Sequence, residues 1–228
     1  MEKIVEWIMR AVVVLICITV HELCHGYAAY KLGDDTAKRA GRLTLNPLKH
    51  IDPIGTLMLF VARFGWAKPV PVNPYNFSNM KRDMALTAAA GPASNFALAV
   101  LSACALKSVW ATSYVAPYFP IEKWILHNPV AGFFVLMIWI NTALGLFNLL
   151  PFPPLDGSKI ISGFMTDDMY FRWMEFERKA AYLLMAILLI SFVTKISLFS
   201  TLIGVPLDFI VDYLIDYAMP TRTGAFGL

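Results

Sequence analysis

Two histidines and a glutamate lie within five residues of one another and are the part of this sequence best suited to chemistry. The run HELCH (21–25) separates the histidines by four positions. Residues i and i+4 share one face of an α-helix, so His21 and His25 can present two imidazoles to one metal ion. Glu22 lies beside them and can act as general base for an attacking water. The alternative is a chance HExxH pattern on an ordinary helix.

This motif lies near the end of an apolar stretch that is long enough to cross a membrane. The sequence AVVVLICITV (11–20) precedes it and GYAAY (26–30) follows it. Ionisable side chains inside a bilayer cost free energy, so their presence there indicates function. Only 15% of the residues are charged, against about 25% in soluble proteins. The net charge of +3 is small and indicates no nucleic-acid partner.

The 228 residues suit one membrane domain covering 1–228, built mainly from α-helices. A helix needs about 20 apolar residues to cross the hydrocarbon core. The stretches of suitable length and composition are approximately 8–30, 84–106, 130–150 and 180–203. Segment 204–219, which Pro206 separates from what precedes it, is either an interfacial helix or, with 196–205, a kinked further span. We therefore expect a polytopic helical bundle of about four to six spans.

The segment 36–78, after the first motif helix, is predicted to be β-rich and re-entrant. Its short apolar runs are separated by glycine, Asn-Pro and Asp-Pro turn signals, and they cover 42–45, 55–62 and 68–73. They predict a small membrane-associated β-hairpin or sheet, although 55–62 is also compatible with a short re-entrant helix. Pro69 and Pro71 cannot donate hydrogen bonds in a central strand, so 68–73 is expected at an edge.

Basic residues predict the orientation of the chain in the membrane. Segments 31–83 and 151–179 are rich in lysine and arginine, whereas 107–129 carries only Lys107 and Lys123. The positive-inside rule then places the first two segments in the cytoplasm and the N-terminus outside. We expect a multi-pass protein of the cell membrane whose active site faces the cytoplasmic side.

Asp156 is the best candidate for a third metal ligand, because a catalytic zinc site usually has three protein ligands and a water. The third span ends in NLLPFPPLDG (148–157), whose prolines end the helix just before Asp156. The first and third spans both run from outside to inside, so Asp156 should reach the same side as the histidines. The alternative is that Asp156 caps or turns the helix that follows it.

Two asparagines at membrane depth also require partners. Asn95 follows Gly91-Pro92 in the second span, and Asn148 lies at the end of the third. Either amide could donate a hydrogen bond to the oxyanion of a tetrahedral intermediate. Each is equally compatible with a structural hydrogen bond between helices, and the spacing does not separate the two roles.

Taken together, HELCH, the GPxxN pattern at 91–95 and the NxxPxPxLDG pattern at 148–157 resemble the site-2 protease family of intramembrane zinc metalloproteases. The resemblance covers most of the chain, and GRLTLNP (41–47) and HIDPIG (50–55) are similar to a compact branch without a PDZ or C-terminal regulatory domain. It implies that His21, His25 and Asp156 hold one zinc ion per chain and that Glu22 is the base. It also implies a membrane-protein substrate.

We therefore expect a zinc-dependent endopeptidase that hydrolyses peptide bonds in or near transmembrane segments. A transmembrane helix hides its backbone, so the substrate segment must unwind, and the edge 68–73 could then hold it by strand addition. One alternative is a membrane metal-binding or transport protein that uses the same ligands. Another is a non-catalytic protein that binds transmembrane segments. Glu22 between the ligands favours hydrolysis. The sequence gives no oligomeric state.

Overall fold

The computed structural model describes residues 2–55, 58, 65–112, 128–194 and 198–220. Its long helices are α1 (Glu2–Lys31), α4 (Met80–Ala111), α6 (Pro129–Asn148), α8 (Asp167–Thr194) and α9 (Leu198–Ala218). Its short helices are α2 (Thr36–Arg39), η1 (Pro47–Lys49), η2 (Pro74–Asn76) and α7 (Asp156–Ser162). In this part of the chain α1, α4 and α6 are long and apolar enough to cross a membrane. The prediction of a mainly α-helical membrane protein is thus confirmed.

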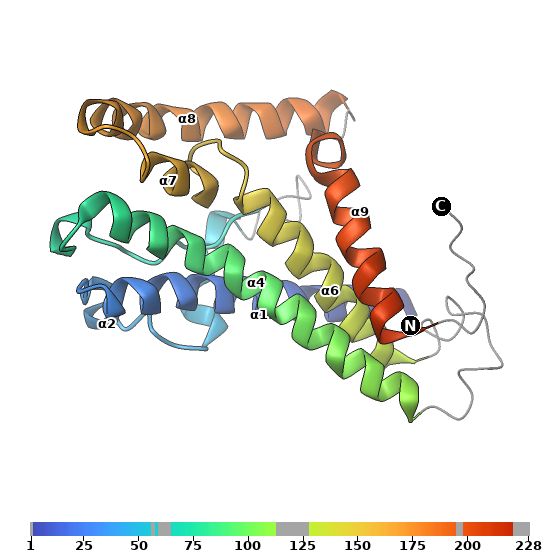
Figure 1. Ribbon diagram of the computed structural model, residues 1–228. Coiled ribbons are helices and arrows are strands. Elements are labelled where there is room, and N and C mark those ends of the chain that lie inside the picture. The colour runs from blue at the N-terminus through green and yellow to red at the C-terminus, as the bar shows by residue number, and fades with distance from the viewer. Residues whose placement is uncertain (1, 56–57, 59–64, 113–127, 195–197, 221–228) are drawn as a thin grey trace.

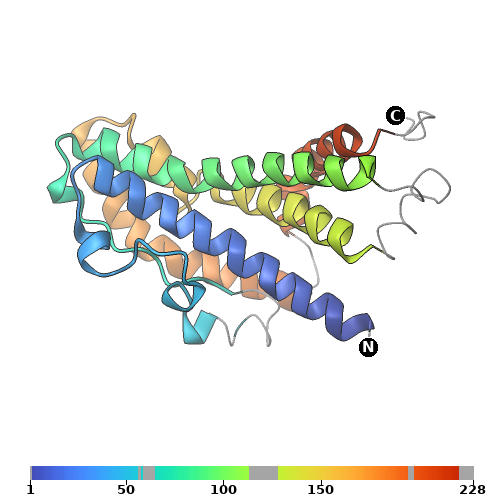
Figure 2. The same ribbon diagram turned by 90° about the horizontal axis from the view of Figure 1, so that it is seen from below.

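The helices α1, α4 and α6 pack against one another, with α4 antiparallel to the other two (Figures 1 and 2). They correspond to the first three predicted spans. Because α1 and α6 run in the same direction, both C-terminal ends lie at one end of the bundle. The short helix α7 follows α6 there and packs against α4. This arrangement brings the residues after α6 to the HELCH end of α1.

The other end of the bundle is closed by α9, which packs on α4 and α6. Its buried residues Leu207, Val211 and Leu214 follow a helical spacing. The three aspartates of the helix are exposed, at positions 208, 212 and 216. Pro206 lies inside α9 and does not interrupt it, which corrects our prediction. Packing of the apolar face on both sides of Pro206 outweighs the loss of one backbone hydrogen bond.

The fourth predicted span, 180–203, does not coincide with one helix. It covers the end of α8 and the beginning of α9, and residues 195–197 between them lie outside the described residues. Segment 204–219 is continuous with the residues from Leu198 onward in α9, and α9 is not among the described helices that are long and apolar enough to cross a membrane. The number of spans beyond the three remains a prediction.

The predicted β-hairpin or sheet in 36–78 is not seen in the described part of that segment, which corrects our prediction. An isolated antiparallel bridge joins Ile51 and Ala67, and residues 42–45 form a turn in which Thr44 N donates to Arg42 O. Residues 68–73 are extended but pair with no strand in the described part of the chain. Their two prolines lack N–H groups, and neighbouring side chains bind much of the remaining backbone. Of the run 55–62, residues 55 and 58 are helical and the others lie outside the described residues.

A buried aspartate fixes this segment to the end of α1. Asp34 is fully buried and accepts hydrogen bonds from Asn73 N and Asn76 Nδ2, both at 2.7 Å. Burial raises the pKa of Asp34, but hydrogen bonds from Thr36, Asn73 and Asn76 outweigh it and lower this pKa below its ordinary value. Asp34 is therefore a stable carboxylate that anchors the far end of the extended residues 68–73.

Candidate metal centre and active site

His21, His25 and Asp156 meet at one point, as the sequence predicted. The Nε2 atoms of the histidines lie 2.9 Å apart, and Asp156 Oδ2 lies 3.1 Å from one and 3.2 Å from the other. The histidines come from adjacent turns of α1. Asp156 is the first residue of α7, and its Oδ2 has no hydrogen-bond partner among the described residues. The aspartate thus faces the histidines and does not cap its own helix.

Hydrogen bonds behind the histidines fix which ring nitrogen carries the proton. His21 Nδ1 lies 2.6 Å from Asn95 Oδ1, and His25 Nδ1 lies 2.8 Å from Thr87 O. Both partners are acceptors, so each Nδ1 is the donor and each Nε2 of the neutral ring carries a lone pair. The orientation of Asn95 is itself set, because its Nδ2 donates to Asn141 Oδ1 at 2.8 Å.

This donor set fits a zinc ion. Two Nε2 lone pairs converge on Asp156 Oδ2, a buried oxygen to which no described residue donates a hydrogen bond. Such an arrangement is repulsive unless a cation lies between these atoms. Two imidazoles and a carboxylate are a ligand set of zinc hydrolases, and acceptors behind the imidazoles are typical of such sites.

Gly91 of α4 makes room for the two imidazoles, a role that our sequence analysis missed. A Cβ atom at this position would lie 2.3 Å from His25 Nε2 and 2.7 Å from His21 Cε1. The second span can therefore pass the metal ligands closely only with glycine. A signal was available, because glycine inside a helix costs about 1 kcal/mol relative to alanine and needs a reason.

Gly91→Ala is accordingly expected to displace both imidazoles and to lower zinc affinity by more than the roughly 10–100-fold that outer hydrogen-bond partners contribute. Zinc content of the purified protein, measured by mass spectrometry against a chelator series, checks this. Ala93→Val, which enlarges an exposed residue of the same helix, is the matched control and should keep its zinc. Full zinc in Gly91→Ala would contradict the close approach.

Glu22 shares a cavity with the three ligands. The cavity has a volume of about 300 Å³, and it is also lined by residues of the extended segment, Asn148 and Lys159. Glu22 Oε2 accepts a hydrogen bond of 2.8 Å from Val70 N. Its other oxygen has no hydrogen-bond partner among the described residues. A carboxylate beside a metal site, with one oxygen held and one available, is suited to general base chemistry.

The two asparagine candidates occupy different places. Asn95 is fully buried and bonds to His21 of α1 and Asn141 of α6, so both of its polar groups are engaged, as in the structural alternative. Asn148 lines the cavity, while its Nδ2 donates to Leu144 O at 3.0 Å. An oxyanion contact for either residue remains a prediction. Asn141 was missed, although an amide within an apolar span should have indicated a buried partner.

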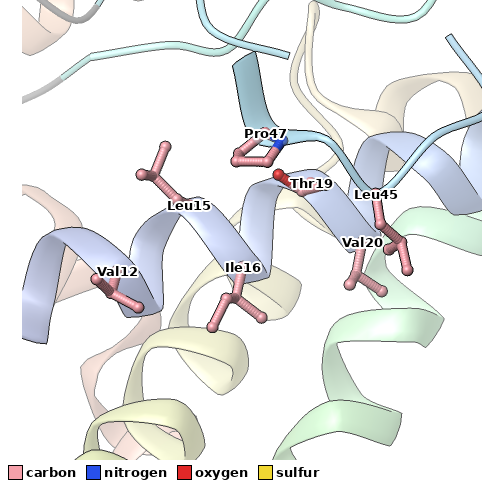
Figure 3. A pocket seen from close by; sticks show the side chains of 7 residues that line it. All are labelled: Val12, Leu15, Ile16, Thr19, Val20, Leu45 and Pro47. Atoms are coloured by element: carbon pink, nitrogen blue, oxygen red, sulfur yellow. The ribbon is translucent and has the colours of Figure 1, made fainter. Parts of the chain in front are cut away.

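A second, apolar hollow of about 380 Å³ lies between α1 and the turn before η1 (Figure 3). On α1 it is lined by Val12, Leu15, Ile16, Thr19 and Val20, and opposite them by Leu45 and Pro47. Leu15, Thr19 and Glu22 follow the helical spacing of a single face. One edge of the hollow, at Leu15 and Thr19, therefore lies on the α1 face that carries Glu22, and we call the hollow the apolar groove.

A family model and several known proteins are similar to much of this chain. The model of peptidase family M50 matches residues 9–193. The chain is 44% identical over 152 residues to the putative zinc metalloprotease YwhC of Bacillus subtilis, covering 66% of each chain. It is 32% identical over 147 residues to the putative zinc metalloprotease Rip2 of Mycolicibacterium smegmatis, covering 63% of this chain and 52% of that protein. The aligned region therefore spans about half to two thirds of these relatives. No significant match to a solved structure was found.

Proposed function

Because the chain belongs to peptidase family M50, the site-2 proteases, we propose that it is a zinc-dependent endopeptidase that cleaves membrane proteins in or near their transmembrane segments. The observation that carries this proposal is the buried cluster of two histidines and an aspartate with Glu22 on the same cavity. A metal-transport function would explain the ligands. It would not explain a carboxylate that lines the cavity beside them and is held by Val70.

In the proposed reaction His21, His25 and Asp156 would hold zinc, which when bound activates a water and polarises the scissile carbonyl. Glu22 accepts the proton of the attacking water and passes it to the leaving nitrogen. Asn95 and Thr87 keep the imidazoles oriented throughout. The burial of these residues limits the water around the ligands to that admitted by the cavity.

The substrate is proposed to be a membrane protein whose segment unwinds beside residues 68–73. This extended segment lines the cavity through Pro69, Val70 and Val72. Val70 N–H is already bonded to Glu22, whereas Val72 N–H has no hydrogen-bond partner in the described part of the chain. Val72, rather than Val70, is therefore the donor we propose for strand addition to the substrate.

The apolar groove supports a site for the part of the substrate that remains helical. Its walls are mostly apolar, and its edge at Leu15 and Thr19 lies on the α1 face that carries Glu22, so a transmembrane helix seated there could deliver its unwound end to the cavity. We also propose a cell-membrane location with this end of the bundle toward the cytoplasm, supported by the basic residues of 31–83 and 151–179.

Leu15→Trp should fill the groove and raise KM for a transmembrane substrate about tenfold, equivalent to about 1.4 kcal/mol of lost binding, while kcat and zinc content are unchanged. The measurement is cleavage of one substrate in proteoliposomes over a range of substrate densities. Ile8→Trp, at an exposed position of the same helix, is the control. An unaltered KM in Leu15→Trp would show that the substrate does not use the groove.

The proposed function is tested by quantitative mass spectrometry of membrane proteins from cells with the wild-type chain or Glu22→Gln. We expect peptides that end within or next to transmembrane segments only with the wild type. A metal-uptake assay on the same cells tests the transport alternative. Uptake that depends on His21 without any cleavage would overturn the peptidase proposal.

A further inference from the structure

Arg42 is a buried cation whose charge is held by backbone carbonyls. Only 6% of the residue is exposed, and no carboxylate of the described residues lies within ion-pair distance of its guanidinium. Nη2 donates to Lys68 O at 2.7 Å and Nη1 to Pro69 O at 3.2 Å. Burying a charge without an opposite charge is costly, so it calls for a purpose beyond packing.

The peptide that Arg42 holds is the one that holds Glu22. Pro69 O, which accepts from Arg42, and Val70 N–H, which donates to Glu22, belong to the same peptide unit. In a trans peptide the C=O and N–H groups point in opposite directions. Arg42 and Glu22 therefore lie at opposite edges of one peptide unit. A cation at the carbonyl polarises that peptide and strengthens the hydrogen bond that its N–H donates.

The neighbouring contacts leave this peptide little freedom. Pro69 and Pro71 fix the backbone on both sides of Val70, and Lys68 N donates to His50 O at 2.9 Å. The side chain of Val70 is buried against α1, where a Cβ atom on Gly26 would lie 3.0 Å from Val70 Cγ1. Packing thus sets the position of Val70, while the rotation of the peptide plane is left to its two hydrogen bonds.

We infer that Arg42 is a positioning residue for the reaction: it orients and polarises the Pro69–Val70 peptide so that Val70 N–H holds Oε2 of Glu22 and leaves Oε1 for the attacking water. This inference rests on the proposed function for its kinetic consequence. Its structural part, that Arg42 maintains the bond between Val70 and Glu22, stands independently. Lysine cannot replace the guanidinium fully, since an ammonium lacks the planar fork that contacts two successive carbonyls.

The test compares Arg42→Gln and Arg42→Lys with wild type in three measurements: zinc content, kcat and KM for one transmembrane substrate, and hydrogen exchange of the Val70 amide in ¹⁵N-valine-labelled protein. Arg39→Gln is the matched control, because Arg39 is exposed and, among the described residues, forms an ion pair with Asp35 alone. We expect Arg42→Gln to keep its zinc. Its kcat should fall about tenfold or more, while its KM stays within about twofold of the wild-type value. The Val70 amide hydrogen should exchange about tenfold faster than in the wild type. Arg42→Lys should show a smaller loss, and Arg39→Gln none.

Unchanged kcat in both Arg42 variants would overturn the inference. A rise in KM with unchanged kcat would overturn it too, because Arg42 would then be a substrate-binding residue. Loss of zinc in Arg42→Lys would overturn it too, by showing a role in the fold of the metal site. If the wild-type chain cleaves no membrane substrate, the proposed function fails. Faster Val70 exchange in Arg42→Gln would then still support the link from Arg42 to Glu22, and unaltered exchange would refute it.

Discussion

Glu22→Gln is expected to keep zinc and to lose cleavage by about 10²–10⁴-fold, the range that a positioned acid–base group contributes. Glutamine has nearly the same volume and leaves His21, His25 and Asp156 untouched. Its amide oxygen can still accept the hydrogen bond from Val70 N that Glu22 Oε2 accepts at 2.8 Å. What it loses is the ability to take a proton from water. The variant thus separates the chemistry from metal binding and folding.

The measurement is single-turnover cleavage of one transmembrane substrate in proteoliposomes, with zinc determined on the same preparation. Glu6→Gln is the control, because Glu6 is exposed on the same helix and its ion pair in the described part of the chain is with Arg10. A Glu22→Gln variant that cuts at close to the wild-type rate with full zinc would remove Glu22 as the base and the peptidase proposal with it.

Short-range spacing made the convergence of His21, His25 and Asp156 predictable. Two histidines on adjacent turns of one helix need no tertiary information, and the direction of three long apolar helices follows from their order. Asp156 was predicted because prolines end the third span just before it. The structure brings it within 3.2 Å of both histidines. These inferences succeed because an α-helix converts sequence spacing directly into spatial position.

The segment between the first two spans was less predictable, because long-range contacts decide its conformation. Val70 and Val72 alternate with prolines as in an edge strand, but Arg42, Asp34 and Glu22 bind the backbone that a partner strand would have used. Such side-chain acceptors and donors lie tens of residues away in sequence and leave no periodic signal.

Glycines and amide side chains inside the helices have roles at the site that hydrophobic periodicity alone does not predict. Gly91 contributes no apolar side chain, yet the absence of its Cβ atom is what admits the imidazoles. Asn141 lies in an apolar span and fixes the orientation of Asn95, which in turn fixes the proton on His21. The metal site thus depends on a network across α1, α4 and α6 whose members each look like isolated exceptions in the sequence.

Removing the third ligand is expected to have the largest effect on metal binding. Wild-type protein should hold about one zinc per chain, as a site with three protein ligands does. Asp156→Ala leaves two imidazoles and no carboxylate, so we expect most of the zinc to be lost, a greater loss than the roughly 10–100-fold typical of outer hydrogen-bond partners. Because Asp156 also begins α7, the fold of the variant should be checked by circular dichroism.

Asp168→Ala is the matched control, since Asp168 is exposed near the start of α8 and is not part of the metal cluster. His25→Ala should resemble Asp156→Ala, because both remove one of the three converging donors. Zinc per chain after dialysis against a weak chelator, followed by readdition of zinc and a cleavage assay, separates weak binding from loss of the fold. If Asp156→Ala retained full zinc and activity, another residue would have to supply the third ligand. The convergence of Asp156 on the histidines would then reflect only the packing of α7 against α4.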